Sequence, residues 1–197
     1  MERSYHHGNL RQVLIDSALG VLADKGVDGF SLRETARRAE VSPAAYKHHF
    51  ADTRRVMTAL AEIAFARLAD ALEAADATAG QDLRARLEAQ GTAYVGFALK
   101  ERALFDLMWR VPLLDPTDPK LAAESARAFD CLDRLIRGPD APSLPNTDPS
   151  MAPTIAAWSL VHGFSRLLLD QGLGAEVDAG SAATLLSAML GRLMVLD

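Results

Sequence analysis

Cysteine is almost absent from this chain, which has one, Cys131, in 197 residues. A single cysteine excludes an internal disulfide framework and any zinc site built from several cysteines. The sequence also lacks an uninterrupted apolar run of about 18 residues, and its first residues, MERSYHHGN, lack the apolar core of a signal peptide. We therefore expect a cytoplasmic protein with no membrane partner, no metal and no cofactor.

Positive charge is scarce overall but is concentrated near the N-terminus. The chain has a formal net charge of −5. Residues 1–60 carry nine Lys and Arg against seven Asp and Glu, whereas residues 61–197 carry 12 against 19. Because attraction to phosphate acts over about 8 Å at physiological salt, a short positive segment on an acidic body suits a protein that binds DNA through one part. The alternative is ordinary surface charge on a helical protein.

Residues 30–50, FSLRETARRAEVSPAAYKHHF, predict two short helices joined by a tight turn. Ser31 followed by Glu34 is a capping box, which starts a helix directly after the serine. Ser42 and Pro43 start a second helix, because serine caps a helix and proline in the first turn loses only an N–H that has no intrahelical partner. Two helices about three residues apart are typical of a helix-turn-helix motif, whose second helix enters the major groove of DNA.

The residues of this region resemble a known family. YHHGNLR at residues 5–11, FSLRETARRAEVSPAA at residues 30–45 and the pair His49 and Phe50 resemble the N-terminal DNA-binding domain of the tetracycline repressor (TetR) family of transcriptional regulators. The resemblance implies a ligand-responsive repressor that binds an inverted-repeat DNA operator as a homodimer. A small, largely apolar effector would release it from the operator.

A second resemblance lies near the C-terminus. Trp158, His162 and Gly163, spaced as in WSLVHG, are similar to the Trp-His-Gly (WHG) signature of one C-terminal subgroup of the TetR family. The two resemblances together frame nearly the whole chain.

The resemblance also assigns roles to residues of the motif. Arg33 and three residues at the start of the second helix would meet base edges, and Arg33 is the main candidate because a guanidinium can form two hydrogen bonds with guanine. The other three are Pro43, Ala44 and Ala45. Residues expected at the phosphates, which fix register without reading sequence, are Ser42, Lys47, His48, His49 and Thr53. For His49 the alternative is a partly buried ring bonded within the domain.

Three positions depart from the usual pattern of the family. Lys47 stands where the family usually has Tyr, and it can replace a tyrosine hydroxyl at phosphate. Thr53 stands where the family usually has Lys, and it cannot replace the lysine charge. Glu40 fills a turn position usually held by Gly, so we expect a strained turn if the backbone there requires a positive φ.

Helical periodicity covers the rest of the chain without a competing strand pattern, so the predicted fold is all-α with about nine helices. A first helix that ends near Gly26 completes a three-helix DNA-binding domain over residues 1–52. Residues 53–197 are expected to form a helical ligand-binding and dimerisation domain. Its helices are predicted at about residues 53–75, 82–100, 103–110, 121–137, 153–171 and 181–196, with an exposed proline-rich loop at 138–150.

The last two predicted helices are too apolar for the surface of a monomer, because their apolar residues extend well past a stripe of about 100°. By the resemblance, these helices and their symmetry mates form a four-helix dimer interface. The predicted interface residues are Leu167, Ala182, Leu186, Met189, Leu190 and Leu193. The alternative is that both helices lie inside one subunit.

Aromatic and sulfur-containing side chains are spread over the predicted helices of the second domain, where they suit an apolar pocket for the effector. The alternative is a plain hydrophobic core, because such residues at helical spacing usually pack. His162 is either a hydrogen-bonding group of the pocket or a satisfied core histidine. The predicted ligand-binding residues are Phe97, Phe105, Met108, Trp109, Phe129, Trp158 and His162.

No catalytic constellation accompanies these patterns. Ser159 and His162 share a predicted helix, but the sequence has no G-x-S-x-G elbow, glycine-rich phosphate loop or H-E-x-x-H motif. We therefore expect no enzymatic activity. A helical interaction module that only resembles a DNA reader is the other alternative, and loss of nucleic-acid affinity at every salt concentration would favour it.

Overall fold

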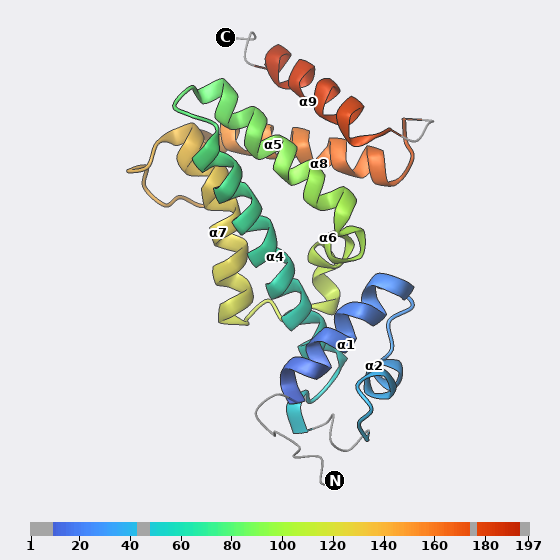
Figure 1. Ribbon diagram of the computed structural model, residues 1–197. Coiled ribbons are helices and arrows are strands. Elements are labelled where there is room, and N and C mark those ends of the chain that lie inside the picture. Colours follow the sequence, from blue (N-terminus) through green and yellow to red (C-terminus); the bar gives the residue numbers. More distant parts are fainter. Residues whose placement is uncertain (1–9, 43–47, 174–176, 194–197) are drawn as a thin grey trace. The chain divides into compact units, whose positions relative to one another are not determined.

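The computed structural model describes residues 10–42, 48–173 and 177–193, apart from the side chains of Ala179 and Leu193. Every regular element in these residues is helical, with eight α-helices and two short 3-10 helices (Figure 1). The predicted all-α fold is confirmed. Among the helices described, none combines the length and the apolar character that a membrane span requires.

The chain divides into two compact units, each made of separate segments. Unit 1 contains residues 1–64 and 103–122, and unit 2 contains residues 65–102 and 123–197. Two helices, α4 (Thr53–Thr78) and α7 (Pro119–Arg137), therefore contribute residues to both units. The two units do not coincide with the predicted domains, whose boundary lies between residues 52 and 53. That boundary, which separates a DNA-binding domain from a ligand-binding and dimerisation domain, stays a prediction.

Unit 1 is built on one buried face of α1 (Leu10–Lys25). Leu14, Val21 and Leu22 of this helix are fully buried, and α1 packs on α2 (Leu32–Arg38). The helix ends where Gly26 adopts a φ of 67°, a left-handed conformation that glycine takes at little cost. The predicted end of the first helix is confirmed.

The second segment of unit 1 contains most of α6 (Arg102–Met108) and the 3-10 helix η1 (Val111–Leu113). Helix α6 buries four of its seven side chains, which are Leu104, Phe105, Leu107 and Met108. A helix this short is marginal by itself, so this burial is what stabilises it.

Unit 2 has α5 (Leu83–Lys100) packed on both α8 (Ala152–Leu169) and α9 (Ala179–Leu193), as Figure 1 shows. Gly91 of α5 lies at this contact. A Cβ atom at position 91 would lie 3.3 Å from Leu186 Cδ2 and 3.4 Å from Val161 Cγ1. The absence of a side chain there is what allows the helices to approach so closely.

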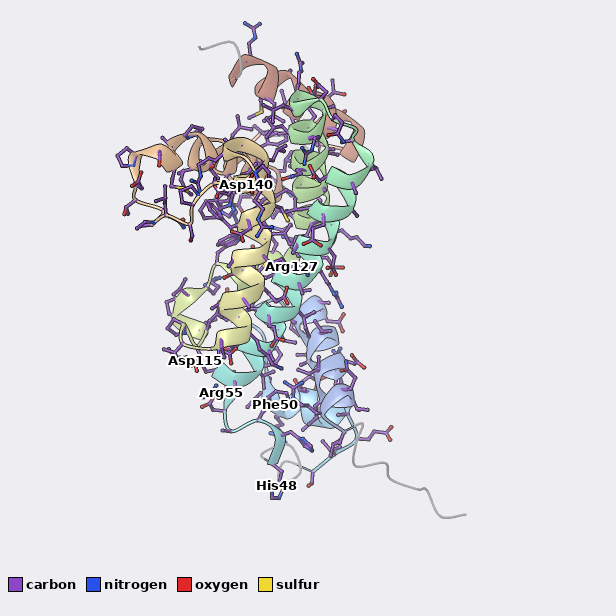
Figure 2. The ribbon with its side chains drawn as sticks, turned by 90° about the vertical axis from the view of Figure 1, so that its left-hand side faces the viewer. His48, Phe50, Arg55, Asp115, Arg127 and Asp140 are labelled. Carbon is purple, nitrogen blue, oxygen red and sulfur yellow. The ribbon has the colours of Figure 1, made fainter. Side chains whose placement is uncertain are left out.

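Polar contacts join the remaining helices of unit 2. Arg127 of α7 (labelled in Figure 2) binds the carboxylates of Asp70 and Glu73 on α4. Thr154 of α8 donates a hydrogen bond of 3.0 Å to Asp133 of α7, and both side chains are buried. The 3-10 helix η2 (Pro149–Met151) directly precedes α8.

The observed helix ends differ from the predicted ones by a few residues. Helix α4 continues to Thr78 rather than 75. Helix α8 ends at Leu169, two residues before the predicted end, because Gln171 adopts a φ of 55° and closes the helix. The start of the second helix of the predicted motif, at Pro43, lies outside the described residues.

Candidate functional site

The first helix of the predicted DNA-binding motif, α2, is held by contacts of its own residues. Ser31 Oγ accepts a hydrogen bond of 3.5 Å from the Glu34 N–H, as the capping box predicts. The Glu34 carboxylate accepts hydrogen bonds from Arg37 and Arg38 at 2.7–3.0 Å. These bonds, first that from Arg37, lower the pKa of Glu34 to about 2. Because Arg38 also pairs with Asp24 at 2.8 Å, the same network fixes α2 on α1.

The turn after α2 is a Schellman motif. The Val41 N–H donates to Ala36 O at 3.0 Å and the Glu40 N–H donates to Arg37 O at 3.2 Å, which are the two bonds that define the motif. Glu40 has a φ of 54°, in the left-handed region that favours glycine. The condition on which we expect glutamate to strain this turn, a positive φ, is therefore met.

The DNA-reading candidates that the structure describes lie at or near the surface. Arg33 on α2 is exposed, as are Ser42, His48 and Thr53, whereas His49 is half-buried. Four further candidates lie outside the described residues: Pro43, Ala44, Ala45 and Lys47. The half-buried His49 leaves both of its predicted roles open.

Residues 110–118, between α6 and α7, are tied by polar contacts to other parts of unit 1, and we call them the connecting segment. Arg110 pairs with Asp28, shortly after α1, at 3.1 Å. Arg54, in the first turn of α4, donates a hydrogen bond of 3.2 Å to Pro112 O.

Asp115 carries two further contacts of the connecting segment. Its carboxylate lies 3.2 Å from Arg55 Nη1, and its N–H donates to Thr58 Oγ1 at 2.9 Å (Figure 2 labels Arg55 and Asp115). Hydrogen bonds from Thr117, and then the charge of Arg55, lower the pKa of Asp115. The carboxylate is therefore ionised at neutral pH, so its ion pair with α4 persists there.

Three of the predicted ligand-binding residues belong to unit 1. Phe105 and Met108 are buried, and Phe105 meets Trp109 edge to face with ring centroids 6.2 Å apart. All three lie in α6 or directly after it, in the same unit as the helix-turn-helix region.

The other four predicted ligand-binding residues belong to unit 2, where three of them form one cluster. Phe129 meets Trp158 edge to face at 5.8 Å, and Trp158 lies 6.2 Å from the His162 ring. His162 Nδ1 is hydrogen-bonded to the hydroxyl of Tyr94 at 2.9 Å. The fourth residue, Phe97, is buried on α5 three positions after Tyr94.

The titratable groups of this cluster are neutral at physiological pH. Burial raises the pKa of Tyr94 well above its ordinary value. Burial, and then the nearby charge of Arg166, lower the pKa of His162, so its imidazole is uncharged at neutral pH. The unit 2 cluster therefore combines aromatic surface with uncharged hydrogen-bonding groups.

The predicted dimer helices bury some of the proposed interface residues within the subunit. Ala182, Leu186 and Leu190 are almost fully buried, and the two leucines face α5 at Gly91. These three side chains have no surface to offer a partner, so we revise their assignment to the subunit core. Met189 is half-buried, and the side chain of Leu193 lies outside the description.

Other apolar side chains of α8 and α9 remain exposed. Leu167 of α8 is 46% exposed and Leu185 of α9 is 43% exposed. Leu185 lines a shallow surface groove with Thr184 and Ala188, among other residues of α9. The prediction of Leu167 as an interface residue is compatible with this exposure and stays a prediction.

Comparison with known proteins places this geometry in one family. The N-terminal pattern described as "Bacterial regulatory proteins, tetR family" matches residues 14–60, and that described as "Tetracyclin repressor-like, C-terminal domain" matches residues 87–193, more than half of the chain. The chain belongs to the TetR family of transcriptional regulators. Its members are helix-turn-helix DNA-binding regulators and not enzymes. No curated protein matches the sequence significantly.

Solved structures agree with the family assignment. A protein of unknown function from a Rhodococcus species is 33% identical, with a TM-score of 0.79 over 97% of this chain and 98% of its own. PfmR from Thermus thermophilus is 19% identical, with a TM-score of 0.66 over 93% of this chain and 98% of its own. LfrR from Mycobacterium smegmatis, solved in complex with proflavine, is 20% identical, with a TM-score of 0.62 over 93% and 95%. At these lower identities PfmR and LfrR share the TetR fold.

Two polar residues of this TetR protein's unit 2 were missed by the sequence interpretation. Tyr94 bonds His162, and Gln90 is buried one turn earlier on α5. Both lie on the buried face of α5, where a polar side chain needs a hydrogen-bond partner. The sequence places both residues on one predicted helix, but it identifies neither the buried face nor the partners.

We predict that Glu40→Gly raises the free energy of unfolding by about 0.5–1 kcal/mol, because glycine relieves the left-handed strain and this relief exceeds the entropy that it adds to the unfolded chain. Gln171→Gly, at the other non-glycine position of positive φ among the described residues, should stabilise similarly. Gly26→Ala, where a Cβ would meet nothing within 4 Å, should destabilise for the same reason. Chemical denaturation measures the free energy of unfolding of all three variants. A Glu40→Gly variant less stable than the wild type would contradict the assignment of strain to Glu40.

Proposed function

We propose that this TetR-family regulator is a ligand-responsive repressor. As a homodimer it binds an inverted-repeat operator, and a small, largely apolar effector releases it. The observation that carries the proposal is the α2 region of unit 1, where a capped helix and a Schellman turn lead into the residues that the family uses to read DNA. The proposed location is the cytoplasm.

In the proposed complex, Arg33 reads sequence and the residues after the turn fix register. An exposed guanidinium on α2 can form two hydrogen bonds with a guanine in the major groove. Ser42 and His48 are exposed and can reach phosphates, which hold the protein without reading bases. Thr53 is also exposed, but it brings no charge to the position where the family usually has lysine, so we expect a weaker phosphate contact there.

The proposed effector site lies in unit 2, around Trp158 and His162. Its aromatic rings and uncharged polar groups suit a small, largely apolar molecule. The relative LfrR was solved in complex with proflavine, which supports a small-molecule effector for this chain as well. Membership of the Trp-His-Gly subgroup, through Trp158, His162 and Gly163, belongs to this proposal.

The proposed dimer uses the exposed faces of α8 and α9. Leu167 and Leu185 expose apolar surface there, and the small side chains of Thr184 and Ala188 would let a partner helix approach closely. A two-fold symmetric contact of this kind would pair the two DNA-reading units for an inverted repeat.

The experiment that tests the proposed function is selection of bound DNA from a random pool with the full-length protein. We expect enrichment of one sequence with two half-sites in inverted orientation, since a symmetric dimer reads a symmetric site. A pool that shows no enrichment after repeated rounds would contradict the regulator function. Enrichment of a single half-site without symmetry would contradict the dimer.

We predict that Arg33→Ala weakens binding to the selected operator by about 1–3 kcal/mol and leaves binding to random DNA nearly unchanged, because the lost contact is to a base. Lys47→Ala should weaken binding to both DNAs alike. Arg37→Ala is the control on the same helix, since its guanidinium pairs with Glu34 at the protein surface. Equal proportional losses for operator and random DNA in Arg33→Ala would contradict the division between reading and positioning.

We also predict that Leu185→Asp and Leu167→Asp give folded monomers, because both side chains are exposed in the subunit and only a dimer would bury the new charge. Leu83→Asp is a matched control, since Leu83 is 44% exposed but lies on α5. It should stay dimeric. Sedimentation velocity measures the oligomeric state of the three variants. If Leu167→Asp and Leu185→Asp both remain dimeric, the interface lies elsewhere.

A further inference from the structure

Gln90 is a buried carboxamide whose orientation is determined by its neighbours. Its side chain on α5 is 3% exposed. Nε2 donates one hydrogen bond to Asp76 Oδ1 at 3.1 Å and another to Cys131 O at 3.2 Å. Because both neighbours are acceptors, the nitrogen of the amide must face them, and the oxygen must face the other way.

Gln90 Oε1, the second polar atom of the amide, is buried and receives no hydrogen bond from any described residue. A buried acceptor without a donor loses its hydration without compensation, and native structures contain few such atoms. No described protein group therefore supplies the donor that Oε1 requires.

Asp76 and Arg86 hold the Gln90 amide in this orientation. Arg86 donates two hydrogen bonds to the Asp76 carboxylate, at 2.9 and 2.6 Å, and lowers the pKa of Asp76. The ionised carboxylate in turn accepts from Gln90 Nε2. This chain of three side chains resembles the outer-shell support of a binding site, in which one polar group positions the next.

Gln90 is linked to the unit 2 cluster by side-chain contacts and by neighbouring positions on α5 and α7. The bond from Gln90 to Cys131 O joins α5 to α7, where Phe129 lies two residues earlier and meets Trp158 of α8. From Trp158 the series continues to His162 and back to Tyr94 on α5. Tyr94 lies four residues after Gln90, on the same face of the helix. All of these residues belong to unit 2.

The titratable side chains of this series are uncharged at neutral pH, and Arg166, whose charge acts on His162, pairs with Asp170. Tyr94 and His162 are neutral, and burial raises the pKa of the Cys131 thiol to about 11. Asp76 is ionised but paired with Arg86. A charged ligand would find no free counter-charge among these residues, whereas a neutral one would find aromatic surface and one strong acceptor.

We propose that Gln90 is the polar anchor of the effector site in unit 2, and that the effector is a neutral, largely apolar molecule whose N–H or O–H group donates a hydrogen bond to Gln90 Oε1. This inference rests on the proposed effector role of unit 2 and names the chemical class of the effector. Asp76 and Arg86 are positioning residues that hold the amide.

The test is a panel of bicyclic aromatic pairs, such as 2-naphthol with 2-methoxynaphthalene and indole with 1-methylindole, in which each pair differs by a methyl group on the donor. Binding to the full-length protein is measured by calorimetry and by the shift in melting temperature. We expect at least one donor compound to bind on the order of tenfold or more tightly than its methylated partner. In Gln90→Met that ratio should fall toward one, whereas Gln81→Met, an exposed glutamine in the same unit, should keep it.

Three results would overturn the proposal: a panel in which no compound binds, equal binding of donor and methylated compounds, or a donor preference that persists in Gln90→Met. A crystal structure of the wild-type complex gives a second measurement that does not depend on the variant. The proposal expects the donor of the compound within hydrogen-bond distance of Gln90 Oε1. A water molecule on Oε1 beside the bound compound, or a compound bound elsewhere, contradicts it. Failure of DNA selection would instead contradict the regulator function, because the panel makes no use of DNA.

Discussion

The hydrogen bond between the Asp115 N–H and Thr58 Oγ1 joins the connecting segment to α4 within unit 1. Thr58 is 2% exposed, and its hydroxyl also donates a hydrogen bond to Arg54 O at 2.8 Å. The hydroxyl therefore acts both as a donor, to Arg54, and as an acceptor, from Asp115. The Asp115 N–H thus finds its hydrogen-bond partner in a buried hydroxyl. With the arginine contacts beside it, this bond makes the connecting segment part of the unit that contains the helix-turn-helix region.

This organisation separates the predicted ligand-binding residues into two groups with different consequences. Phe105, Met108 and Trp109 belong to unit 1, so a molecule bound to them would contact the unit that contains the helix-turn-helix region. Phe129, Trp158 and His162 belong to unit 2, with Gln90 and Tyr94. An effector held by unit 2 alone changes DNA affinity only if it binds two arrangements of the protein with different affinity.

Local signals in the sequence were sufficient for much of the fold. Ser31 and Gly26 mark helix ends through contacts within a few residues. The expectation for Glu40 came from the resemblance to the family, which usually has glycine at that position. The contacts of Gln90 could not be predicted in the same way, because its partners lie 14 and 41 positions away and depend on how α4, α5 and α7 pack. The apolar faces of α8 and α9 show a related limit. Periodicity indicates that more than one face is buried, but only the packing on α5 shows that Leu186 and Leu190 belong to the subunit core.

We propose that binding of a small molecule and binding of operator DNA are coupled in this protein. The most direct measurement is the affinity for the selected operator, without ligand and at saturation with the panel compound that binds most tightly. We expect the compound to weaken operator binding by about 1–3 kcal/mol, and operator DNA to weaken binding of the compound by the same factor, because such coupling is reciprocal. An operator affinity that is identical with and without a saturating compound would contradict it.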